Sequence, residues 1–101
     1  MKISGLLMDK KDNVVTCVVD IHKGETVYYM KNDEMCQVVA QEDIPYCHKI
    51  ALCNLGKDEI ILKYGEMIGK TLRPIAQGCW VSHLNIYSVS RDYDSEMLKL
   101  D

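Results

Sequence analysis

No apolar run in this 101-residue chain approaches the roughly 20 residues that a membrane-spanning helix needs. The N-terminal apolar stretch is cut short by Asp9, so it lacks the longer apolar region of a secretory signal. Lys and Arg are scattered, and the formal net charge is -3, so the chain offers no basic patch to a nucleic-acid backbone. We therefore expect a cytoplasmic protein that binds neither membranes nor nucleic acids.

The sequence patterns of several reactive sites are also missing. Five cysteines are present without a Cys-x-x-Cys pair, and an odd number leaves one thiol unpaired in any set of disulfides. Neither a Ser/His/Asp pattern nor a Gly-rich phosphate loop occurs. We expect the cysteines to be reduced and mostly buried as small hydrophobic side chains.

The apolar residues that are present alternate in short runs and seldom keep helical spacing. Runs of about four to eight residues between Gly, Pro, Asp or Asn are typical of strands in a small barrel-like or sandwich-like all-β domain. The predicted strands cover residues 3–8, 13–19, 26–30, 36–40, 49–52, 60–64, 67–72 and 80–87. Only the C-terminal end favours a short helical turn, capped by Asp94 or Ser95, with a frayed tail as the alternative. A chain of this length predicts a single domain over residues 1–101 with one small core.

A three-position pattern with an apolar residue at each end recurs along the chain. It occurs at Ile21-x-x-Gly24-x-x-Val27, Ile44-x-x-Cys47-x-x-Ile50, Leu55-x-x-Asp58-x-x-Ile61 and Ile75-x-x-Gly78-x-x-Val81. The middle residue suits a turn with positive φ, for which Gly is preferred. The pattern therefore predicts anchored turns between short strands.

Two stretches are richer in polar function than a turn requires. Pro45 predicts a bend that places His48 and Lys49 just before a strand, where they could bind a carboxylate or move a proton. Lys63 and Tyr64 stand at the mouth of a turn that Gly65 and Gly69 are expected to flank, where an ammonium and a phenol could bind a hydroxy acid. In both stretches the alternative is an ordinary loop with solvated side chains.

A third stretch, residues 78–86, predicts a strand whose alternate side chains face opposite ways. Ser82 and Leu84 would share one face, and His83 and Asn85 the other. One His is too few for a metal site, although it could complete one with ligands from a partner chain.

Several motifs follow one another in a set order. They are Asp12-Asn13-Val14, Asp20-Ile21-His22-Lys23-Gly24-Glu25, Ile44-Pro45-x-x-His48-Lys49-Ile50-Ala51-Leu52, Lys63-Tyr64-Gly65-x-x-Ile68-Gly69 and Pro74-Ile75-Ala76-x-Gly78-x-x-Val81. In order and spacing these motifs resemble the SAF domain at the N-terminus of altronate and galactarate dehydratases, over roughly residues 10–88. In that family the domain also occurs as a separate small polypeptide, as in the small subunits of altronate dehydratase and sulfolactate sulfo-lyase.

The resemblance implies a β-clip fold and a lyase reaction on a 2-hydroxy or polyhydroxy acid. It implies Fe²⁺ or another divalent metal, held mainly by a large partner subunit, and it leaves homo-oligomers open. On this basis His48 and Lys49 are predicted to be catalytic. Lys63, Tyr64, Asn85 and His83 are predicted to bind substrate, His83 only as a substitute for a family histidine that this chain lacks.

The chain departs from the family at two places. The family strand after the last glycine usually reads Val-His-x-His-Asn, whereas Ser82 and Leu84 hold the two His positions here. Cys47 stands where the family commonly has Gly. The resemblance therefore predicts the small subunit of a sugar-acid dehydratase or lyase, incomplete alone, with a non-catalytic sugar-acid-binding or oligomerisation module as the alternative.

Overall fold

The computed structural model describes residues 2–87 and is built of antiparallel strands. The strands are β1 (Gly5–Leu6), β2 (Val14–Cys17), β3 (Thr26–Lys31), β4 (Glu34–Val39), β5 (Lys49–Ala51), β6 (Ile60–Lys63), β7 (Glu66–Thr71), β8 (Trp80–Val81) and β9 (Ile86–Tyr87). The described residues form no helix, and hence none that could span a membrane. The all-β prediction is therefore confirmed, while the predicted C-terminal helical turn lies outside the described residues.

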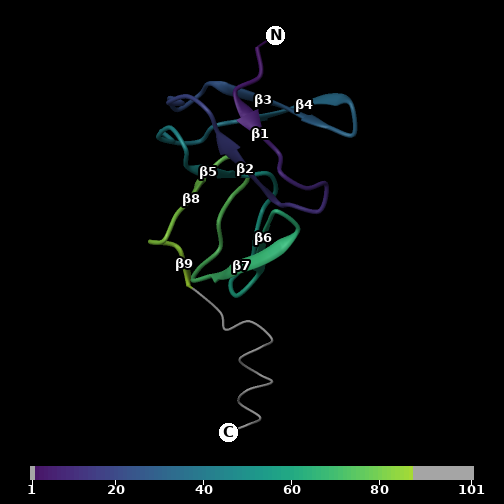
Figure 1. The fold of residues 1–101 in the computed structure, drawn as a ribbon. Helices are drawn as coiled ribbons and strands as arrows, with labels where there is room; N and C mark the ends of the chain where they lie inside the picture. The colour runs from purple at the N-terminus through teal and green to yellow at the C-terminus, as the bar shows by residue number, and fades with distance from the viewer. Residues whose placement is uncertain (1, 88–101) are drawn as a thin grey trace, which may run out of the picture.

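The strands form three layers. A central sheet in the order β1-β2-β5-β8 lies between the hairpin β3–β4 on one side and the sheet β6-β7-β9 on the other. Figure 1 shows β3 and β4 at the top, β2, β5 and β8 in the middle, and β6, β7 and β9 at the bottom. The central sheet therefore has a hairpin packed against each of its faces.

Each face of the central sheet has its own apolar core, because successive side chains of a strand point to opposite faces. Val15 of β2 and Ile50 of β5 are paired across strands and pack with residues of β3 and β4. Val14 and Ala51, the neighbouring pair, pack with Ile61 of β6. The alternation within each short strand thus joins three layers with two small cores.

The four anchored turns that the sequence predicts are confirmed. Each middle residue has positive φ: 91° at Gly24, 72° at Cys47, 60° at Asp58 and 89° at Gly78. All eight apolar anchors are buried. The first anchors also pair with each other, Ile21 with Ile44 and Leu55 with Ile75, as isolated bridges. The turns therefore connect the layers through buried residues.

The predicted strand over residues 80–87 is wrong, because a turn divides it into β8 and β9. Asn85 makes this turn: its Oδ1 accepts a hydrogen bond from the Ser82 N–H at 2.8 Å, and its Nδ2 donates to the Trp80 carbonyl at 2.6 Å. Ser82 Oγ also accepts from the Leu84 N–H at 3.1 Å. The predicted alternation of faces through residues 82–85 is therefore lost.

The prediction that Gly69 flanks a turn is also wrong. It lies within β7, and the turn between β6 and β7 consists of Tyr64 and Gly65. A Cβ on Gly69 would lie 2.6 Å from the Tyr87 carbonyl oxygen, so its lack of a side chain allows β9 to approach β7.

The cysteines are less buried than the sequence analysis predicted. All five are free thiols, but only Cys17 is buried, and burial raises its pKa to about 11. Cys36 and Cys79 are partly exposed, whereas Cys47 and Cys53 are exposed because they lie in loops.

Candidate functional site

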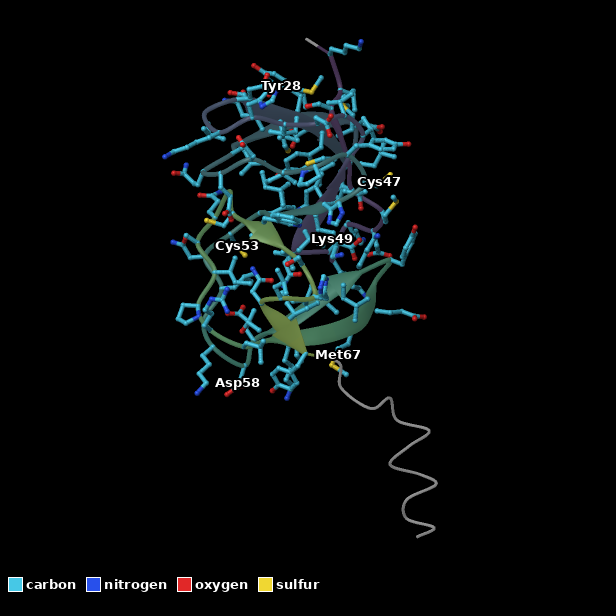
Figure 2. The ribbon with its side chains drawn as sticks, turned by 90° about the vertical axis from the view of Figure 1, so that its left-hand side faces the viewer. Tyr28, Cys47, Lys49, Cys53, Asp58 and Met67 are labelled. Atoms are coloured by element: carbon cyan, nitrogen blue, oxygen red, sulfur yellow. The ribbon has the colours of Figure 1, made fainter. Side chains whose placement is uncertain are left out.

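Lys49 stands at the start of β5 with its side chain half-buried, on the face of the central sheet that carries Ala51. Its partners across the neighbouring strands are Thr16 of β2 and Val81 of β8. Because Val81 and Ala51 belong to the core shared with β6, this face points toward the β6–β7 hairpin. Figure 2 shows Lys49 at mid-height of the molecule, between the two hairpin layers.

The charge of Lys49 is poorly solvated. Burial lowers its pKa below the usual lysine value, and the positive charge of Lys63 lowers it further. Lys63 is the last residue of β6, and its Nζ lies 5.2 Å from the centre of the Tyr64 ring. Tyr64 is itself 62% exposed. The structure therefore brings three of the predicted site residues together, Lys49, Lys63 and Tyr64.

Thr16 adds a polar group that the sequence analysis missed. The Cys17 N–H donates to the His48 carbonyl at 2.8 Å, so the adjacent pair Thr16 and Lys49 is of the type without backbone hydrogen bonds, whose side chains approach most closely. The Thr16 Oγ1 is buried and has no hydrogen-bond partner. An unpaired hydroxyl therefore lies on the neighbouring strand, on the same face of the sheet as the Lys49 side chain. A Thr in an apolar strand is common, so the sequence carried little signal for it.

Asp12 holds the hairpin turn that presents Lys63 and Tyr64. It is buried, and its carboxylate accepts hydrogen bonds from the N–H groups of Tyr64 at 2.8 Å and Gly65 at 2.7 Å. Tyr64 and Gly65 have φ of 62° and 73°, the two positive values of a two-residue hairpin turn. A Cβ on Gly65 would lie 2.8 Å from the Asp9 carboxylate, so Gly is needed there on two grounds.

Asn13 holds β6, the strand that leads into this turn. Its Oδ1 accepts from the Leu62 N–H at 2.8 Å, and its Nδ2 donates to the Ile60 carbonyl at 2.9 Å. The adjacent Asp12 and Asn13 therefore tie β6 and its turn to the start of β2. The sequence showed both residues before a strand but gave no sign of the element that they contact 47 to 53 positions away.

His48 lies on the other face of the central sheet from Lys49. The Trp80 Nε1–H donates to its Nδ1 at 3.2 Å, and the two rings meet edge to face at 89° with centres 5.1 Å apart. Because Nδ1 accepts this bond, the proton of the neutral ring is on Nε2. The two adjacent residues predicted to be catalytic are therefore not directed at one point.

His83 and Asn85 lie in the turn after β8. The His83 side chain is exposed, whereas the amide of Asn85 makes the two backbone hydrogen bonds that shape the turn. The start of this turn is near Lys49, since Val81 of β8 pairs with Lys49. The roles predicted for His48, His83 and Asn85 stay predictions.

The described residues do not fit a resident metal ion. Within residues 2–87, no group of three or more His, Cys, Asp or Glu side chains is arranged to hold one. The cluster around Lys49 supplies two ammonium groups, which have no lone pair for a metal and repel a divalent cation. This part of the chain instead suits an anion.

Comparison with known proteins identifies the family of the chain. The model of the altronate/galactarate dehydratase SAF domain matches residues 3–89. The chain is 32% identical to the (2R)-sulfolactate sulfo-lyase subunit alpha of Chromohalobacter salexigens, over 88% of this chain and 95% of that protein. It is 31% identical to the altronate dehydratase of Bacillus subtilis over 84% of this chain, but only 16% of that protein. The chain therefore belongs to the family of the altronate/galactarate dehydratase SAF domain.

Proposed function

We propose that the chain is the small subunit of a hydroxy-acid lyase and contributes a substrate-binding patch to a site shared with a larger subunit. The coverage of its relatives supports this arrangement. The chain spans nearly all of a protein that is itself a subunit of a sulfo-lyase, but only a small part of a complete dehydratase. We propose that the rest of the site comes from a larger polypeptide.

The observation that carries the proposal is the half-buried lysine pair. Lys49 has a lowered pKa because burial and Lys63 both disfavour its charge. A carboxylate or sulfonate placed beside these ammonium groups relieves that cost, and the attraction is stronger in a partly desolvated site than in water. The Thr16 hydroxyl would donate its hydrogen bond to the same anion. We name Thr16, Lys49, Lys63 and Tyr64 the lysine patch.

The lysine patch suits the binding side of an elimination reaction. Such a reaction removes a proton next to a carboxylate and expels a group from the neighbouring carbon. Lysine charges that neutralise the carboxylate make the adjacent C–H more acidic and hold the acid in one orientation. The exposed Tyr64 phenol can hydrogen-bond a substrate hydroxyl. We propose a small 2-hydroxy or polyhydroxy acid, sulfolactate among the candidates, as the substrate class.

We place the chemical step on the partner. The described residues of this chain lack a metal-ligand cluster, and we propose that Fe²⁺ or another divalent metal of the assembled enzyme is held by the large subunit. Bound there, the metal would supply a Lewis acid for the developing enolate charge. The small subunit would bind and orient the acid and shield it from water.

The test is co-expression with a large subunit of the family, sought among the reading frames beside its gene, followed by assay of elimination from sulfolactate, altronate and galactarate with ferrous iron. Lys49→Met and Lys63→Ala are each expected to lower kcat/KM by about 10- to 100-fold, the loss of one charge-assisted contact to substrate. Lys57→Met is the matched control, because Lys57 is exposed and belongs to another turn.

Two results would count against this proposal. An intact complex in which both variants keep full activity would remove the lysine patch from the site. A chain that does not associate with the large subunit would contradict the subunit assignment and favour a non-catalytic sugar-acid-binding module.

A further inference from the structure

The outer edge of β4 has no neighbouring strand among the described residues. The hairpin β3–β4 forms a sheet of its own two strands, whereas in the other hairpin β9 pairs with the outer edge of β7. The two hairpins otherwise occupy similar positions on opposite faces of the central sheet (Figure 1). The place that β9 fills beside β7 is therefore open beside β4.

Backbone hydrogen bonds show which groups of β4 face outward. On the far edge of the hairpin, the backbone N–H and C=O of Tyr28 point away from β4. The Tyr28 carbonyl accepts a hydrogen bond from the Ser4 N–H at 3.0 Å, and the Tyr28 N–H donates to Ser4 Oγ at 3.1 Å. Its cross-strand partner Gln37 therefore directs its own N–H and C=O away from β3. The backbone N–H and C=O of Met35, two residues earlier, also point away from β3. The carbonyl of Val39 lies against Gly78, so the open stretch is residues 35–37.

The only charged residue of β4 is Glu34, which lies at its start beside the turn. Residues 35–41 include no charged residue and no proline, and the β3–β4 register runs without a bulge. Exposed edges are usually protected by such features, Lys above all. Met30 and Met35 form a cross-strand pair on the outer face and are 42% and 46% exposed. The open edge is thus short, regular and uncharged.

We propose that a second copy of the chain adds to this edge, with the two β4 strands antiparallel around a two-fold axis. Met35 of each copy would pair with the partner's Gln37, and Cys36 would face the partner's Cys36. This register makes about four backbone hydrogen bonds. It places Glu34 opposite the partner's Val38, so no like charges meet.

A groove at the end of the open edge fits the same register. A cavity of about 250 Å³ is lined by Gln37, Val38, Val39, Gln41 and Gln77. The partner's turn, Asn32 and Asp33, would reach this cavity, where the glutamine amides can donate to its carboxylate and backbone carbonyls. The strand is therefore complementary to itself both along its edge and at its end. This self-complementarity selects a second copy as the occupant.

The test is the mass of the full chain in reducing buffer, measured by sedimentation equilibrium over a range of protein concentrations. The expected result is a dimer that Gln37→Pro and Met35→Lys each convert to monomer. Proline at position 37 removes only an outward N–H, so the hairpin is kept, as circular dichroism should show. Val19→Lys is the matched control, because Val19 is equally exposed, at 44%, away from this edge.

The register has its own readout. Treatment of the dimer with diamide should join the two Cys36 side chains, because residues facing each other without backbone hydrogen bonds come close enough for a disulfide. Two thiols are oxidised to one disulfide, and the reagent takes up their two hydrogens. Cys36→Ser should abolish the cross-link.

A monomer at all concentrations would overturn the proposal, as would a dimer that persists in both edge variants. So would a chain that dimerises only when the large subunit is present. These measurements use the small chain without substrate, so their failure leaves the lyase proposal standing.

Discussion

The hairpins β3–β4 and β6–β7 have the same kinds of turn but differ at their tips and outer edges. Each follows an anchored turn in which a glutamate closes the loop: Glu25 Oε1 accepts from the His22 N–H at 2.6 Å, and Glu59 Oε1 accepts from the Gly56 N–H at 2.7 Å. Each also has a two-residue turn at its tip with positive φ at both positions. The shared plan builds the three layers.

The differences lie at the tips and the edges. Asp12 binds the N–H groups of the β6–β7 turn and so positions Lys63 and Tyr64, whereas the β3–β4 turn at Asn32 and Asp33 is exposed. β9 pairs with the outer edge of β7, whereas no strand within residues 2–87 pairs with the outer edge of β4. We propose that one hairpin serves as a ligand site and the other as an interface, and that a few added contacts at the tips and edges account for the difference.

Removing the charge of Asp12 should weaken the hydrogen bonds that distinguish the β6–β7 tip from the β3–β4 tip. Asp12→Asn leaves the buried N–H groups of Tyr64 and Gly65 without a full carboxylate, and should lower the free energy of unfolding by about 2 kcal/mol. Asp33→Asn, the same change at the exposed tip, should stay within about 0.5 kcal/mol. Urea titration measures both. Equal losses in the two variants would mean that Asp12 does not hold the turn.

A smaller effect sharpens the comparison between equivalent turns. Cys47 has φ of 72°, in the left-handed region that disfavours a side chain, while Gly78 holds the corresponding turn of the other half. Cys47→Gly should raise the free energy of unfolding by about 1 kcal/mol by removing this strain. Asp58→Gly should gain less, because Asp58 also accepts a hydrogen bond from the Tyr87 hydroxyl at 2.9 Å. A lower melting temperature for Cys47→Gly would contradict the strain assigned to Cys47.

Much of the fold could be predicted because its signals are local. The alternation of apolar residues marks most strands, and the spacing of Ile21, Gly24 and Val27 recurs wherever a turn needs positive φ. The division of residues 80–87 was missed because it depends on the Asn85 amide, whose competition with strand pairing leaves no periodic trace.

The site was less predictable because its members meet only through tertiary structure. Lys49 and Lys63 belong to different strands, and the sequence paired each with its chain neighbour instead. His48 and Lys49 are adjacent in sequence but face opposite sides of the central sheet. The contribution of Thr16 depends on its cross-strand register with Lys49, which no local pattern reveals.

The most direct test of the lysine patch is the pKa of Lys49, followed by NMR at its side-chain Cε in the full chain. Burial and Lys63 should place this pKa below the usual lysine value, and sulfolactate or altronate should raise it by stabilising the ammonium form. Affinity for the acid should then fall as pH rises through the lowered pKa, before ordinary lysines lose their charge. A Lys49 that titrates at the usual lysine value and does not respond to either acid would contradict the claim that this patch binds the substrate.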